Sequence, residues 1–155
     1  MATDHPRRGP LPTPVELGAR VVTAGLAAAM GGIHLSLWST GYRHIHIIGL
    51  LFLLNGIGSI LLAVGLLATP SRLLAPTAAL TVVFTVGTLA GLVLSLTTGV
   101  FGFEESTGVP LLTHTVWVES AGIITTAIVA AAYAPATLTW LRHRQPQCVR
   151  VGDMR

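Results

Sequence analysis

The chain has no lysine, one cysteine and very few charged side chains of any kind. Charged residues are 10% of its 155 residues, whereas soluble domains carry about 25%. A chain this short exposes a large share of its residues, so these charges cannot cover a surface that faces water. The composition excludes a soluble globular enzyme, a disordered chain and a nucleic-acid-binding protein. The single cysteine, Cys148, excludes an internal disulfide and a metal site with several thiolate ligands.

Long apolar stretches make up most of the sequence. Hydrophobic residues are 52% of the chain, and no charged residue occurs within 21–42, 44–71 or 73–103. A membrane-spanning helix needs about 20 mostly apolar residues, and a continuous apolar run indicates a helix rather than a strand of a barrel. We therefore predict an all-α membrane protein with four spans, at residues 17–38, 47–68, 77–98 and 111–132 or slightly beyond.

The connections between these spans are short, which places consecutive helices side by side and antiparallel. The expected architecture is an up-down four-helix bundle. We divide the chain into three parts: a disordered N-terminal segment (residues 1–16), the transmembrane bundle (residues 17–141) and a basic C-terminal tail (residues 142–155). No segment outside the bundle is large enough to fold alone, so any chemistry belongs to the bundle or its loops.

The arginines predict the orientation of the bundle. With both termini inside the cell, eight of the nine arginines lie on the cytoplasmic side and only Arg43 lies outside. Such a bias is typical of membrane proteins, whose cytoplasmic loops are rich in positive charge. We expect a multi-pass protein of a bacterial cytoplasmic membrane, in contact with the lipid bilayer, with cytoplasmic N- and C-termini.

Small residues recur every fourth position in the third span, at Gly87, Gly91, Ser95 and Gly99, and Gly122 lies in a similar stripe of the fourth span. On a helix this spacing forms a narrow groove that lets another helix approach closely. We interpret the stripes as packing surfaces within the bundle. The alternative is a face for a homo-oligomer or a larger membrane complex.

Four polar side chains lie inside the predicted spans, near their outer ends. Glu119 and Asn55 are each about 12 Å deep, His34 is about 6–10 Å deep, and His114 is near the mouth of its span. Ionisable groups inside a membrane are costly and often functional. We expect the four side chains to form one layer, which can also serve only to hold the helices in register.

Several kinds of chemistry fit this layer. A Cu, Zn or Fe ion could be bound by histidine and glutamate side chains. The candidate ligands are His34, His114 and Glu119 of the spans, with His44 and His46 of the outer loop. A haem b could take His34 and His114 as axial ligands, with Met30 a weaker alternative and Asn55 nearby. Glu119 and His34 are also the candidate catalytic residues, as a general acid and base. The sequence does not choose among these alternatives.

Two segments carry a resemblance. The first is GIHLSLWSTGYRHIHIIGLLFLLNGIGS, residues 32–59, and the second is LSLTTGVFGFEES, residues 94–106. They resemble segments of a family of four-span integral membrane proteins of actinobacteria. In size and layout the chain is also loosely similar to the DoxX-like group, small bacterial proteins often linked to oxidoreductase partners. The resemblance implies an integral membrane protein with polar motifs that face outward, and it names no substrate.

The leading interpretation is an accessory or binding subunit, associated with a redox complex, that has a His/Glu site near its extracytoplasmic face. The alternative is a membrane-embedded oxidoreductase or isomerase that uses the same site. A further alternative is a component of a transport system.

Overall fold

The computed structural model describes residues 12–102, 104, 108 and 111–144, and this part of the chain is almost entirely helical. The elements are α1 (Pro14–Thr40), the short 3₁₀ helix η1 (Tyr42–His44), α2 (His46–Ala68), α3 (Ser71–Thr97) and α4 (Leu112–Arg144). All four α-helices are long and apolar enough to cross a membrane. The predicted four-helix, all-α class is confirmed. Most of the predicted N-terminal segment and of the tail lies outside the described residues.

Helix α1 begins at Pro14, three residues before the predicted boundary. The Thr13 side chain accepts a hydrogen bond from the backbone N–H of Glu16, at 3.2 Å, and so satisfies one of the free donors at the helix start. Proline is well suited to the first helical position because its missing N–H would have no partner there. Thr13, Pro14 and Glu16 together set the start of the helix.

Helix α3 begins at Ser71, six residues before the predicted start at residue 77, and contains Pro76. A proline inside a helix leaves the carbonyl four residues earlier without its usual donor. Here the carbonyl of Arg72 accepts a hydrogen bond from the Thr137 hydroxyl of α4, at 2.8 Å. A side chain from another helix therefore replaces the missing bond, which the sequence pattern around Pro76 does not indicate.

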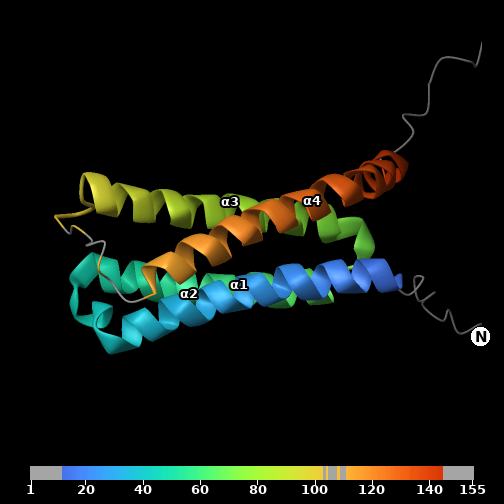
Figure 1. The fold of residues 1–155 in the computed structure, drawn as a ribbon. Helices are drawn as coiled ribbons and strands as arrows, with labels where there is room; N and C mark the ends of the chain where they lie inside the picture. Colours follow the sequence, from blue (N-terminus) through green and yellow to red (C-terminus); the bar gives the residue numbers. More distant parts are fainter. Residues whose placement is uncertain (1–11, 103, 105–107, 109–110, 145–155) are drawn as a thin grey trace, which may run out of the picture.

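The four helices form two antiparallel pairs, α1 with α2 and α3 with α4 (Figure 1). Helix α4 crosses against α1, and the contact between α2 and α3 is the least extensive of the neighbouring pairs. One end of the bundle holds η1, the end of α3 and the start of α4, and we call it the η1 end. The other, the terminal end, holds Pro14, the α2–α3 connection and Arg144.

Glycines allow α1 and α2 to approach closely. A Cβ atom on Gly31 would lie 3.0 Å from the carbonyl oxygen of Gly56, and one on Gly56 would lie 2.6 Å from the Leu35 side chain. Near the η1 end, a Cβ on Gly49 would lie 2.5 Å from the carbonyl oxygen of Tyr42. Gly31 and Gly56 therefore make a tight contact between α1 and α2.

The dry core of the bundle lies toward its terminal end. It consists of small and branched side chains buried among all four helices: Ala24, Ala27, Ala63, Leu66, Leu74, Ala78 and Val129. Many large apolar side chains face outward instead, including Leu61, Val83 and Ile128. An apolar outer surface is expected where lipid rather than water surrounds the helices. The terminal end is closely packed, whereas the η1 end contains the cavity described next.

Candidate functional site

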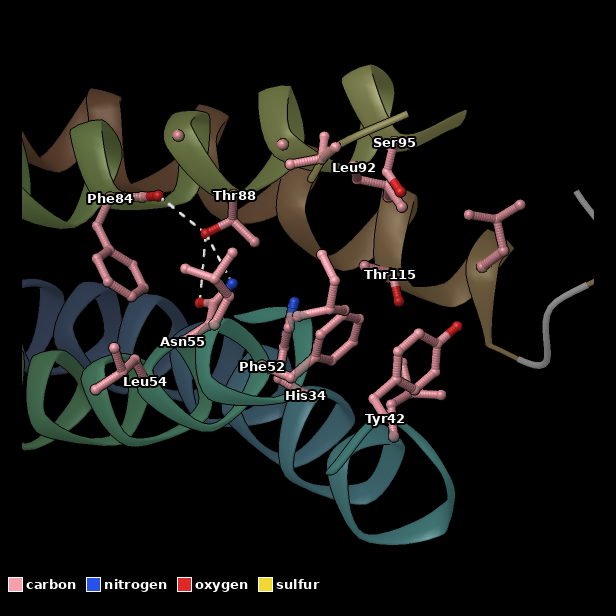
Figure 2. A pocket seen from close by; sticks show the side chains of 17 residues that line it. His34, Tyr42, Phe52, Leu54, Asn55, Phe84, Thr88, Leu92, Ser95 and Thr115 are labelled. Carbon is pink, nitrogen blue, oxygen red and sulfur yellow. Dashed lines mark hydrogen bonds between the residues drawn. The ribbon is translucent and has the colours of Figure 1, made fainter. Parts of the chain in front are cut away.

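A cavity of about 390 Å³ opens between α2 and α3 at the η1 end of the bundle (Figure 2). Its walls come mainly from apolar side chains of these two helices, such as Phe52 and Leu92, with contributions from α1, η1 and α4. Gly91 of α3 and Leu54 of α2 line the cavity and are also exposed. The cavity therefore opens to the surface of the bundle between α2 and α3.

The contact between α2 and α3 ends where the cavity begins. At successive levels from the terminal end, Gly65 lies near Thr77 and Gly58 lies against the Phe84 ring. The last contact between α2 and α3 before the cavity is the hydrogen bond from Asn55 Nδ2 to Thr88 Oγ1, at 3.0 Å. This bond is drawn in Figure 2. Beyond this bond the glycines of α3 leave the space between the helices open.

Both partners of that bond are fixed further. The Thr88 hydroxyl lies 3.0 Å from the Phe84 carbonyl, to which it can donate, and the Ser59 hydroxyl donates to the backbone carbonyl of Asn55 at 2.7 Å. Asn55 therefore forms an interhelical hydrogen bond between α2 and α3. Its amide and the Thr88 hydroxyl form a polar patch at the floor of the cavity.

Aromatic rings line the opposite part of the cavity. Tyr42 and Phe52 stack with their centroids 4.3 Å apart, and Phe52 in turn lies 5.4 Å from the His34 ring at an interplanar angle of 42°. Figure 2 shows these three side chains grouped on the side that faces α3 and α4. Rings in this arrangement present both apolar faces and a surface that can attract a cation.

His34 of α1, the third ring of this wall, lies close to Glu119 of α4. His34 Nε2 is 3.9 Å from Glu119 Oε1, and the Glu119 side chain is 0% exposed. The Nδ1 atom of His34 is 3.0 Å from the carbonyl oxygen of Met30, one turn away on the same helix. Neither carboxyl oxygen of Glu119 has a hydrogen-bond partner among the described residues.

Glu119 lies between the large cavity and a much smaller one. Thr115, one turn before Glu119, lines the large cavity, whereas Gly122, about one turn after it, lines a cavity of about 10 Å³. The small cavity is lined by threonines of three helices, and it is about the size of a single water molecule. Beyond it lies the dry core. His34 lines the large cavity and not the small one, so the pair is in contact with the large cavity.

The structure brings together three of the four residues of the predicted polar layer. His34, Asn55 and the buried Glu119 lie at or directly behind the cavity wall. His114 does not join them, because its side chain is exposed on α4. Met30 is buried and faces the small cavity instead of the large one. The structure therefore does not pair His34 with His114 as two ligands of one haem.

The predicted loop ligands also lie apart from the cavity. His44 and His46 are exposed, and His44 Nε2 accepts a hydrogen bond from Arg43 Nε at 2.9 Å. In the described part of the chain, no three His, Cys, Asp or Glu side chains come together in a way that could hold a metal ion. The described ligand set therefore does not fit the metal-ion interpretation.

The small-residue stripe of α3 does not pack against another helix at its first two glycines, Gly87 and Gly91. A Cβ on Gly87 or Gly91 would meet no atom within 4 Å, and both residues line the cavity. Ser95 lines it as well. Gly99 lies beyond the last residue of α3, in the left-handed region with φ of 75°. Gly122 of α4, in contrast, lies at a helix contact, with its Cβ position 3.9 Å from the Leu26 side chain of α1.

A buried ion pair at the terminal end was missed by the sequence analysis. Arg20 donates to Glu16 Oε1 from Nη2 at 2.8 Å, and Ser71 of α3 donates to the same oxygen at 2.6 Å. Arg20 Nη1 also donates to the carbonyl oxygens of Leu66 and Thr69 at the end of α2, at 2.9 and 2.6 Å. The four-residue spacing of Glu16 and Arg20 is a signal for such a pair.

These contacts give Arg20 a structural role. It neutralises Glu16 and supplies donors to the carbonyls that a helix leaves unpaired at its C-terminus. Three helices are joined by this one group, so the terminal end is held closed. From the sequence, Arg20 is interpreted only as an indication of orientation, whereas in the structure its charge is compensated by Glu16.

Comparison of the chain with known protein families, with curated proteins and with solved structures finds no match.

Proposed function

We propose that this membrane protein binds a small, largely apolar molecule in the cavity between α2 and α3. The observation that carries the proposal is the cavity itself, with about 390 Å³ of space inside a bundle whose other half is closely packed. Ligand sites of small molecules are mostly apolar concavities of about 300–1,000 Å³ with a few polar groups. The Asn55–Thr88 pair and His34 are polar groups of this kind.

The path of entry follows from the same geometry. The cavity opens between α2 and α3, beside outward-facing apolar side chains such as Leu54. In a bilayer this opening faces lipid, so an apolar molecule dissolved in the membrane reaches the cavity without crossing water. The aromatic pair of Tyr42 and Phe52 supplies a flat apolar surface on which a ring can stack.

The proposal is tested by NMR of methyl-labelled protein in lipid nanodiscs, with 2-phenylethylamine and 2-phenylethanol as probes. The Leu92 methyl signals are expected to shift in a saturable way, because Leu92 lines the cavity. The signals of Leu138, which is exposed near the terminal end of α4, serve as the control and should not move. If neither probe shifts Leu92, or if Leu138 responds equally, the cavity is not a ligand site.

A second candidate is docking of a transmembrane helix on the same face, from a second copy or from the partner of an accessory subunit. The observation that favours it is that Gly87 and Gly91 are exposed and have open space at their Cβ positions. Small residues four apart are typical of helix contacts in membranes. This candidate predicts a complex that dissociates when Gly91 is enlarged.

We further propose that both termini face the cytoplasm of a bacterial cell, as the distribution of arginines indicates. The single cysteine in the sequence, Cys148, makes a direct test available. In intact cells a membrane-impermeant maleimide should leave Cys148 unlabelled, and labelling should appear after lysis. A His44→Cys variant that also carries Cys148→Ser should show the opposite behaviour. Labelling of Cys148 in intact cells would reverse the proposed orientation.

A further inference from the structure

The hydrogen-bonding capacity of His34 is set by its own helix. Its Nδ1 atom lies 3.0 Å from the Met30 carbonyl oxygen. A carbonyl oxygen can only accept a hydrogen bond, so Nδ1 carries the hydrogen. In the neutral ring the other nitrogen, Nε2, is then an acceptor. This is the nitrogen that lies 3.9 Å from Glu119.

As a carboxylate, Glu119 adds two more acceptor atoms and no donor. Both of its carboxyl oxygens are without a hydrogen-bond partner among the described residues, and its side chain is 0% exposed. An unpaired carboxylate in such surroundings is strongly disfavoured. The site therefore has three acceptor atoms and needs a donor, which is either a proton shared by Glu119 and His34 or a donor group that a ligand brings.

No cationic side chain of the described chain supplies this donor. The cavity lining includes His34 of α1, whereas α2 and α3 contribute only neutral side chains to it. Glu119 of α4 does not line the cavity and lies behind His34, with Oε1 3.9 Å from Nε2. The third titratable group at the cavity is the phenol of Tyr42. Arg43 is exposed and bonded to His44. Arg20 is bonded to Glu16 at the other end of the bundle.

We propose that the cavity takes a lipid-soluble amine, which binds as its ammonium cation in exchange for a proton held by His34 and Glu119. This rests on the proposed binding function and specifies the chemical class of the ligand. An ammonium group supplies N–H donors to an acceptor-only site and compensates the charge of the carboxylate. The stacked rings of Tyr42 and Phe52, beside His34, add cation–π attraction.

The exchange conserves charge. Before binding, the proton is on Glu119 and both residues of the pair are neutral. A neutral amine that arrives from the lipid takes this proton, which passes from Glu119 Oε1 to His34 Nε2 and on to the amine nitrogen; the ammonium group so formed donates to Nε2. The amine has left its own proton in the water outside the membrane, so in total one cation is bound and one proton is released, and Glu119 becomes a carboxylate beside the bound cation. The pair releases its proton toward the large cavity, because His34 lines that cavity and the terminal side is closed by the dry core.

The test is isothermal titration calorimetry of the protein in nanodiscs, near neutral pH, in two buffers with different enthalpies of ionisation. 2-Phenylethylamine is compared with 2-phenylethanol, which has a similar shape and no charge. The amine is expected to bind at least about tenfold more tightly and to release about one proton per bound molecule. The alcohol should release none. Equal affinities, or no proton release with the amine, would overturn the inference without the need for any variant.

Substitution of Glu119 tests whether this residue carries the proton that is released on binding. Glu119→Gln should abolish both the preference for the amine and the proton release, whereas Glu104→Gln, at an exposed position near the η1 end, should leave both unchanged. Unchanged proton release in a folded Glu119→Gln protein would contradict the assignment to Glu119. Equal shifts of the Leu92 methyls by both probes would leave the binding function intact and refute the ammonium inference. The absence of any shift would refute both.

Discussion

Replacing Arg20 by alanine is expected to lower the free energy of unfolding by about 3–5 kcal/mol, the cost of breaking a buried ion pair from one side. The guanidinium group is buried and bonds Glu16 from Nε and Nη2, at 3.0 and 2.8 Å. Its loss leaves a buried carboxylate with only the Ser71 hydroxyl as donor. It also leaves the carbonyls of Leu66 and Thr69 without this partner.

The measurement is equilibrium unfolding in lipid bicelles, with Arg142→Ala as the matched control. Arg142 is exposed at the end of α4, so its removal should change stability by less than about 0.5 kcal/mol. The double variant Glu16→Gln with Arg20→Ala should be more stable than Arg20→Ala alone, because it no longer buries an unpaired charge. Equal stabilities of Arg20→Ala and Arg142→Ala would show that the pair does not hold the terminal end together.

The Gly91→Phe variant is expected to weaken the binding of either probe by at least about tenfold, which corresponds to 1.4 kcal/mol. Gly91 lines the cavity, and a Cβ atom placed on it meets nothing within 4 Å. A phenylalanine ring can therefore grow into the cavity without displacing α3. The change removes the space that the ligand requires while leaving the four helices in place, so helical content and unfolding should stay close to those of the unmodified protein.

Gly32→Phe is the matched control for this variant. Gly32 is exposed on α1 and also has nothing within 4 Å of its Cβ position, but it does not line the cavity. Its binding of the probes should be unchanged. If Gly91→Phe binds the probes normally and instead dissociates a complex of two chains or of two proteins, the α3 face is a helix-docking surface. Normal binding with no change in assembly would mean that the probes bind elsewhere.

Much of the fold could be predicted because it follows from the distribution of charge along the chain. Apolar runs between arginines gave four helices in the correct order. Helix ends were harder, because they depend on single contacts. Near the start of α3, the carbonyl of Arg72 that Pro76 leaves without a donor is paired by Thr137, a partner 65 positions away in the chain. A pattern of neighbouring residues does not contain that information.

The candidate site was predictable in its residues more than in its shape. The depth of His34 and Glu119 along their helices placed them in one layer, and the structure brings Nε2 and Oε1 to 3.9 Å. The rotation of α4, which turns His114 outward, depends on how the helix packs. Whether Gly87 and Gly91 line a cavity or a helix contact also depends on packing, because small residues suit a tight helix contact and an open cavity equally well.

The most direct test of a ligand site in this bundle is an intermolecular nuclear Overhauser measurement on the protein in nanodiscs with 2-phenylethylamine. Cross-peaks are expected between the ring protons of the probe and the methyl groups of Leu92, Val100 and Leu112, which line the cavity from three parts of the chain. None is expected to Leu138. Cross-peaks to outward-facing methyls such as those of Leu61 and Val83, and none to Leu92, would place the probe in the surrounding lipid and contradict the proposed function.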